Sequence, residues 1–129
     1  MREIKFRGRC KNNGKWFYYG DYCTIPNPNI LFYNQDNEID CIEVNESTVG
    51  QYIGLKDNKG VEIYDEDIIE FYDGNELVRG EVEWLQEGCM FVVRVSNETG
   101  QHYLELCGDE KFNCNVIGNI YDNKVLLEN

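Results

Sequence analysis

The feature that most constrains the fold of this chain is a series of short runs in which β-branched and aromatic residues alternate with polar ones. Residues 3–10, 16–23 and 77–86 follow this pattern, and turn-forming residues separate such runs at regular intervals along the sequence. Alternation with a period of two places successive side chains on opposite faces of a strand. Regularly spaced turns favour antiparallel hairpins. The sequence therefore predicts a mainly β protein, all-β with one or two short helices.

The opening hairpin is predicted most directly. Asn13-Gly14 lies between strands expected at 3–10 and 16–23, and this dipeptide tolerates the positive φ angles of tight hairpin turns. Prolines at positions 26 and 28 remove ladder donors, so residues 25–29 are not expected to form a central strand. Residues 33–38 are expected to form a polar loop.

One short helix is expected over residues 46–52, because Asn45 or Ser47 can cap its start and glycines at 50 and 54 limit its length. The polar segment 108–115 has room for one helical turn. Further strands are predicted at 61–64, 68–72, 77–86, 89–96, 101–107 and 116–121. Residues 89–93 are all apolar, which indicates a strand covered on both faces.

Composition limits the class of protein. The 129 residues suit one domain, 1–129. The 24 acidic residues against 12 basic ones give a net charge of −12, which argues against direct binding to DNA or RNA. The amino terminus has no apolar signal region and no run is long enough to cross a bilayer. We therefore expect a cytoplasmic protein that does not contact membranes.

The cysteines are expected to be reduced thiols. The six of them lie at positions 10, 23, 41, 89, 107 and 114 without a Cys-x-x-Cys spacing, and no secretion signal supports a disulfide framework. The single histidine, His102, has no serine or cysteine tied to it by a catalytic motif. A zinc site and nucleophilic catalysis are both disfavoured, and cysteines are expected as small buried hydrophobes.

The densest candidate site is the acidic segment with Asp65, Glu66, Asp67 and Glu70. In an extended chain Asp67 and Glu70 point to opposite sides, so the carboxylates are divided. The segment also lacks the ligand order of an EF-hand loop. Residues 62–67 are expected to face water while Ile68 leads into a buried strand. No catalytic, cofactor-binding or metal-binding residue is predicted, and no cofactor.

The aromatic residues are expected in the core and in subunit interfaces. A stacking platform for single-stranded nucleic acid would need a basic groove, which an acidic chain does not favour. The set comprises Trp16, Phe17, Tyr18, Tyr19, Tyr22, Tyr52, Tyr64, Phe71 and Tyr72.

Three blocks of sequence resemble one family. Residues 1–7 (MREIKFR), 48–64 (TVGQYIGLKDNKGVEIY) and 116–121 (VIGNIY) resemble, in order, the YopX family of phage and prophage proteins. The resemblance implies a small, mainly β pseudo-barrel that works in the cytoplasm of a bacterial host. It also implies self-assembly, and no catalytic residue is established for the family.

Three positions depart from the family pattern. Glu66 stands where relatives usually have glycine, Gly8-Arg9-Cys10 replaces a small residue and an aromatic, and Lys124 replaces a proline. The first departure weakens the claim that a tight glycine turn is required before the strand at 68–72. The other two affect only local geometry.

Three functions follow from these observations. The leading hypothesis is a non-enzymatic accessory protein that forms a homo-oligomer and binds a host or phage protein. An acidic mimic of nucleic acid, occupying the basic groove of a host protein, is the alternative suggested by the net charge. A metal-dependent hydrolase using Glu66 and Asp67 is a weaker one.

Overall fold

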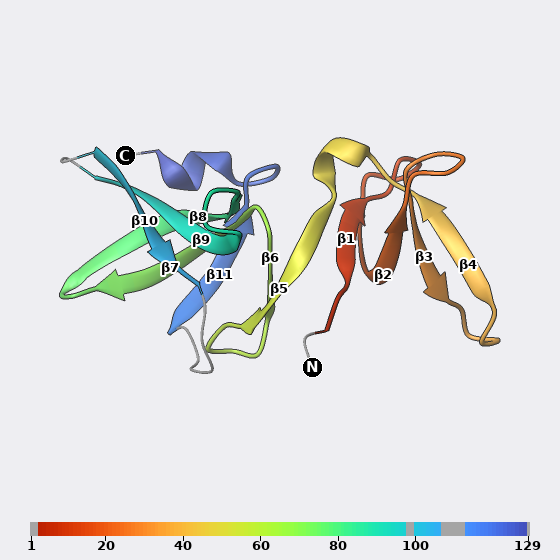
Figure 1. Cartoon of the computed structure of the whole chain (residues 1–129), viewed down its shortest axis with the longest axis horizontal. Coiled ribbons are helices and arrows are strands. Elements are labelled where there is room, and N and C mark those ends of the chain that lie inside the picture. Colours follow the sequence, from red (N-terminus) through yellow and green to blue (C-terminus); the bar gives the residue numbers. More distant parts are fainter. Residues whose placement is uncertain (1–2, 98–99, 107–112, 129) are drawn as a thin grey trace. The chain divides into compact units, whose positions relative to one another are not determined.

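The computed structural model describes residues 3–97, 100–106 and 113–128. The chain divides into two compact units, unit 1 (Met1–Tyr52) and unit 2 (Ile53–Asn129). Strand β5 (Gly50–Lys56) begins in unit 1 and ends in unit 2 (Figure 1). Whether the units fold together as one domain stays a prediction.

Unit 1 consists of antiparallel strands in the order β4-β3-β2-β1, followed by the start of β5. The strands are β1 (Phe6–Arg9), β2 (Trp16–Cys23), β3 (Asn29–Tyr33) and β4 (Ile39–Glu43). The predicted opening hairpin is confirmed, and Gly14 adopts a positive φ of 68° in its turn. The expected polar loop at 33–38 is confirmed for residues 34–38, which connect a second hairpin, β3–β4, whereas Tyr33 ends β3.

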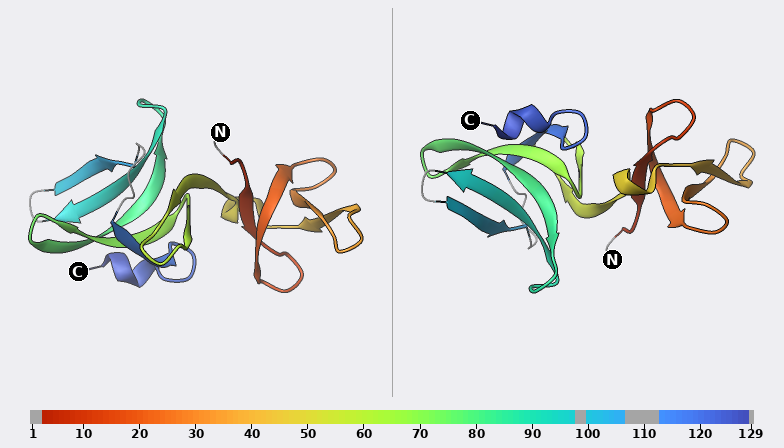
Figure 2. Two further views of the ribbon diagram at one scale, coloured as in Figure 1. Left: turned by 90° about the horizontal axis from the view of Figure 1, so that it is seen from below. Right: turned by 90° about the horizontal axis from the view of Figure 1, so that it is seen from above.

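Unit 2 contains an antiparallel five-stranded sheet in the order β10-β9-β8-β7-β11, and the end of β5 pairs with β6. Its strands are β6 (Glu62–Tyr64), β7 (Asp67–Asp73), β8 (Glu76–Leu85), β9 (Met90–Asn97), β10 (Gly100–Glu105) and β11 (Cys114–Asn119). The sheet curves strongly (Figure 2). The prediction of a mainly β, antiparallel protein is confirmed. In the described residues the five-stranded sheet is open, with β10 and β11 as its edge strands, so the term pseudo-barrel describes it only loosely.

The core of unit 2 lies on one face of this sheet. Its buried members come from β5 to β9, from β11 and from Leu106 just after β10: Ile53, Ile63, Ile69, Phe71, Val82, Phe91, Val93, Val95, Leu106 and Cys114. On β9 both Val92 and Val93 are buried, so the prediction that this strand is covered on both faces is confirmed. Burial of branched side chains at this density stabilises the unit by about 1.5–3 kcal/mol per side chain.

Unit 1 has a smaller interior around Ile30, Val44 and Cys10, all buried. Gly20 is needed there because a Cβ atom would lie 2.5 Å from the carbonyl oxygen of Leu31 and would also overlap the Ile30 side chain. The close approach of β2 and β3 therefore depends on the missing side chain.

The predicted helix at 46–52 is wrong. Only a 3-10 turn, η1 (Glu46–Thr48), forms there, and β5 starts at Gly50. Thr48 Oγ1 accepts a hydrogen bond from Arg9 N at 2.9 Å, and Gly50 pairs with β1. Pairing with a distant strand therefore overrides local helix capping signals.

The remaining non-strand segments lie in the second half of the chain. The helical turn expected at 108–115 falls largely outside the described residues, and Cys114 opens β11. A second 3-10 turn, η2 (Lys124–Leu127), follows β11. Within the part of the chain that the structure describes, no helix has the length and apolarity to cross a membrane.

Candidate functional site

The acidic segment forms the turn between β6 and β7. Asp67 is only 2% exposed, and its Oδ2 accepts a hydrogen bond from Tyr64 N at 2.8 Å. The prediction that residues 62–67 face water is wrong for Ile63 and Tyr64, which are buried, and for Asp67. Its carboxylate closes the turn, because a buried backbone amide needs an acceptor.

Glu66 adopts the conformation for which glycine is usually chosen. Its φ is +73°, in the left-handed region. Its N–H donates to the carbonyl oxygen of Val82 at 2.7 Å, and its own carbonyl oxygen accepts from Ile120 N at 3.0 Å. The tight turn before β7 therefore forms with Glu66 in place of glycine.

Asp57 organises the turn between β5 and β6. It is 5% exposed, and its Oδ1 accepts hydrogen bonds from Lys59 N and Val61 N at 2.8 and 2.9 Å. Its Oδ2 accepts from Val116 N at 3.0 Å, which ties the turn to β11. Burial tends to raise the pKa of Asp57, but these backbone donors outweigh it and hold the pKa below its ordinary value.

The buried carboxylates are thus committed to structural hydrogen bonds. Glu70, the remaining acid of the predicted candidate cluster, pairs with Arg79 at 2.9 Å on the other side of the sheet. Among the described residues, no group of three or more His, Cys, Asp or Glu side chains could hold a metal ion. The absence of catalytic, cofactor and metal residues stays a prediction.

The described cysteines are all free thiols, as predicted. Cys10 and Cys114 are buried, whereas Cys41 and Cys89 are exposed, so the expectation of burial holds only in part. Burial, together with the charges of Asp57 and Asp67, raises the pKa of Cys114 to about 11. The Cys114 thiol is therefore protonated and unreactive near neutral pH.

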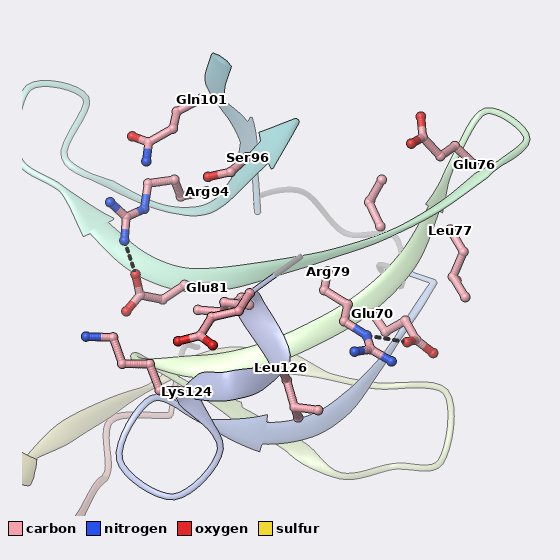
Figure 3. Close-up of a pocket in the computed structure, with 13 residues that line it drawn as sticks. Glu70, Glu76, Leu77, Arg79, Glu81, Arg94, Ser96, Gln101, Lys124 and Leu126 are labelled. Carbon is pink, nitrogen blue, oxygen red and sulfur yellow. Dashed lines mark hydrogen bonds and ion pairs between the residues drawn. The ribbon is translucent and has the colours of Figure 1, made fainter. Parts of the chain in front are cut away.

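A groove of about 930 Å³ lies in unit 2 between the sheet and η2 (Figure 3). Arg94 binds Glu81, its cross-strand neighbour, and Arg79 binds Glu70 in the same way. Lys124 lies on η2 at the edge of the groove. Both arginines are thus matched by carboxylates, which leaves little positive charge for an anionic ligand.

The Arg94 cluster is also stable towards titration. The hydrogen bond with Glu81 raises the pKa of Arg94 above its ordinary value. Glu83 lies 3.4 Å from Arg94 Nε, yet its partial burial raises the pKa of its carboxyl. Arg94 therefore remains charged and engaged at any physiological pH.

Unit 1 carries a different kind of surface. Four large side chains that are 62–70% exposed, Ile4, Tyr19, Tyr33 and Ile39, line one depression of about 540 Å³. We call these four residues the unit 1 apolar surface. Tyr33 and Ile39 are direct cross-strand partners on β3 and β4. Large apolar side chains gathered on one face mark contact sites more often than single exposed ones do.

The one lysine in this depression is already compensated. Lys5 Nζ lies 4.8 Å from the ring centroids of both Tyr19 and Tyr52 and 3.2 Å from Glu3 Oε1. Tyr19 holds a positive φ of 73°, a strained conformation for an aromatic residue. The cation–π contacts keep the Lys5 charge against the rings, and the carboxylates of Glu3 and Asp21 also line the depression.

Charge divides unevenly between the units. Residues 1–52 contain seven acidic and six basic residues, a net charge of −1. Residues 53–129 contain 17 acidic and six basic residues, a net charge of −11. Almost all of the excess negative charge of the protein therefore belongs to unit 2.

These features define a small, mainly antiparallel β protein. The family model described as YopX protein matches residues 5–128. The chain belongs to the YopX family.

A solved structure shares the fold. The crystal structure of protein EF1440 from Enterococcus faecalis is similar with a TM-score of 0.51 at 18% sequence identity, covering 99% of this chain and 100% of that one. None of the curated proteins matches the chain significantly. At this identity the likeness supports the fold alone.

Sequence reasoning identified the acidic segment and missed the surfaces. Ile4 lies in a predicted strand, whereas Tyr33 lies in the expected polar loop and Ile39 directly follows it. Local sequence does not tell which of these side chains a neighbouring strand leaves uncovered. Tyr19 and Tyr72 were expected in the core or in interfaces, and both are exposed. The charged residues can be counted in the sequence, but the net charge of each unit can be calculated only when the boundary between the units is known.

Proposed function

We propose that this protein is a phage or prophage accessory protein without enzymatic activity, which self-associates and acts by binding another protein in the host cytoplasm. Family membership supports the origin. The use of Asp57 and Asp67 in backbone hydrogen bonds supports a non-enzymatic role. The observation that carries the binding function is the unit 1 apolar surface.

The composition of this surface suits a protein partner. Its aromatic and aliphatic side chains are the types enriched at the centres of protein interfaces. The charge of Lys5 is held by Glu3 and by two tyrosine rings, so an apolar partner that covers this lysine does not leave its charge isolated. The low net charge of unit 1 also limits long-range repulsion of an acidic partner.

A capture experiment with matched variants tests the binding function. Ile39→Lys places a charge in the unit 1 apolar surface, and Val125→Lys places one at an equally exposed apolar position of unit 2, since the two side chains are 69% and 68% exposed. Immobilised wild-type protein and both variants are incubated with lysate of a bacterial host. The expected result is a specific partner retained by wild type and Val125→Lys and lost from Ile39→Lys.

Two outcomes would contradict this proposal. One is equal retention by Ile39→Lys, which would exclude the unit 1 apolar surface as the contact. The other is hydrolytic activity of the purified protein that depends on an added divalent metal. This result would support the hypothesis of a metal-dependent hydrolase.

An acidic mimic of nucleic acid is the second candidate, favoured by the −11 charge of unit 2. A basic groove that accepts such a surface would bind it in a strongly salt-dependent way. Repeating the capture at rising salt separates the candidates. Partners lost at high salt and consisting of nucleic-acid-binding proteins would support the mimic, whereas salt-resistant capture through unit 1 would exclude it.

A further inference from the structure

One edge of the unit 2 sheet is left without a strand neighbour. β10 pairs with β9 in a regular ladder from Gly100↔Asn97 to Glu105↔Val92, without a bulge. Its other side has no strand partner among the described residues, and it forms the outer strand of the sheet (Figure 2). An edge of this length exposes a row of backbone donors and acceptors.

The hydrogen bonds show which backbone groups point outward. Leu106 N donates to the carbonyl oxygen of Phe91 at 3.1 Å, continuing the β10–β9 ladder. In an antiparallel ladder, bonded pairs alternate with pairs whose N–H and C=O groups point away from each other. The N–H and C=O groups of Gln101 and Tyr103 therefore point away from β9, towards the open edge.

The edge of unit 1 differs, because it is partly occupied. On β4 the carboxylate of Asp40 accepts the N–H of Cys41 at 2.8 Å. The carbonyl oxygen of Glu43 accepts Lys11 N at 3.0 Å. β10 contains neither proline nor lysine, which are common protections of an edge strand.

We propose that β10 pairs antiparallel with β10 of a second copy of this chain, about a two-fold axis at Tyr103, so that the two five-stranded sheets become one. The inference rests on the proposed self-association and names its surface. This register sets Gln101 opposite Glu105 of the partner subunit and His102 opposite Leu104 of the partner subunit.

The register is self-complementary in charge. Glu105 is the only acidic residue of β10, and in this register it faces glutamine, so no like charges lie directly opposite. Tyr103, 47% exposed, faces Tyr103 of the partner subunit, and cross-strand aromatic pairs stabilise a sheet. These features favour a second copy over a foreign strand as the occupant.

The salt dependence of binding distinguishes a second copy of the chain from a foreign strand at this edge. Each unit 2 carries a net charge of −11, so pairing two of them is opposed by repulsion that salt screens. The β10 dimer therefore tightens as salt rises. A basic foreign strand would bind more weakly under the same change.

Proline variants test the pairing. Gln101→Pro and Tyr103→Pro each remove an outward N–H that β9 does not use, and proline is tolerated on edge strands in this position. Tyr103→Val shortens the side chain and keeps the N–H, so it is the matched control. Multi-angle light scattering over a range of concentrations at low and high salt gives the dimer dissociation constant. Thermal unfolding monitored at Trp84 confirms that each variant is folded.

The expected result is a wild-type dimer that tightens with salt, and a dissociation constant at least about tenfold higher in both proline variants than in Tyr103→Val. If Tyr103→Pro does not fold, the dissociation constant of the Gln101→Pro dimer alone tests the pairing. An unchanged dimer in the proline variants would overturn the β10 pairing and leave self-association intact. A wild-type monomer at every concentration would overturn both, and a dimer that loosens with salt would overturn the pairing.

Discussion

The two units differ in what they bury and in what they present to solvent. Unit 2 contains a core of ten buried residues and carries a net charge of −11. Unit 1 is nearly neutral and leaves four large apolar side chains exposed around one depression. The buried core stabilises the fold of unit 2, and exposed apolar side chains of the kind found in unit 1 are typical of a contact surface.

The acidic residues illustrate the same contrast. In unit 2, Asp57 and Asp67 are buried and accept backbone hydrogen bonds. In unit 1, Asp36 and Asp40 lie exposed in or beside a hairpin turn. A count of acidic residues therefore mixes structural acids with solvated ones, and only the structure separates them.

The largest effect is expected from Asp57→Ala. The variant leaves the amides of Lys59, Val61 and Val116 without their acceptor, so the free energy of unfolding should fall by about 3 kcal/mol. Asp36→Ala in unit 1 is the control, with a change within about 0.5 kcal/mol. Urea unfolding measures both. Equal losses of stability in the two variants would contradict the distinction between buried, hydrogen-bonded acidic residues and solvated ones.

Paired glycine substitutions probe whether the units are independent. A Cβ at Gly20 would lie 2.5 Å from the Leu31 carbonyl oxygen, and one at Gly80 would lie 2.8 Å from the Arg94 carbonyl oxygen. Gly20→Ala and Gly80→Ala should each cost about 2 kcal/mol through forced backbone shifts.

Each unit contains one tryptophan, Trp16 in unit 1 and Trp84 in unit 2, so fluorescence reads the two separately once the other is changed to phenylalanine. Independent units predict that Gly20→Ala shifts only the Trp16 transition and Gly80→Ala only the Trp84 transition. Coincident shifts at both probes would show one cooperative domain.

The pH dependence of unit 2 should reflect Asp57. Because its folded pKa is lowered, its contribution is fully present above the ordinary carboxyl pKa and is lost as the pH falls through the lowered value. The stabilities of wild type and Asp57→Asn should therefore converge as the pH falls below about 4. Urea unfolding of both proteins at a series of pH values measures this. A constant difference down to the lowest pH would assign the effect of Asp57 to packing.

The smallest effect concerns the turn at Glu66. Glu66→Gly and Glu66→Ala remove the same carboxylate, but only glycine adopts a φ of +73° without strain. The glycine variant should therefore be more stable than the alanine variant by about 1 kcal/mol, as measured by thermal unfolding. Equal stabilities would mean that the turn relaxes when the side chain is removed.

The sequence predicted what is local in this molecule. Alternation and the Asn13-Gly14 turn are encoded in neighbouring residues, and the strands they predict are confirmed. The helix expected at 46–52 fails because β1 pairs with Gly50, more than 40 residues away. The role of Asp57 depends on Val116, 59 residues further along the chain. Long-range hydrogen bonds of this kind leave no periodic signal in the sequence.

Both proposed surfaces are likewise properties of the tertiary structure. Alternation shows that Ile39 and Tyr103 share a face with their second neighbours, but it does not tell whether that face or that edge is covered. The acidic segment attracted attention through composition, yet its buried member Asp67 closes a turn. Both proposed surfaces were therefore identified from side-chain exposure and strand pairing, and neither property can be derived from one segment of the sequence.

The most direct test of the division between the units is the molar mass of Ile39→Lys in light scattering, measured beside wild type at the same concentration and salt. Self-association through β10 of unit 2 predicts that this variant keeps the wild-type dimer mass while losing the captured partner. A monomeric Ile39→Lys protein that remains folded would contradict the account, because it would assign self-association to the unit 1 apolar surface.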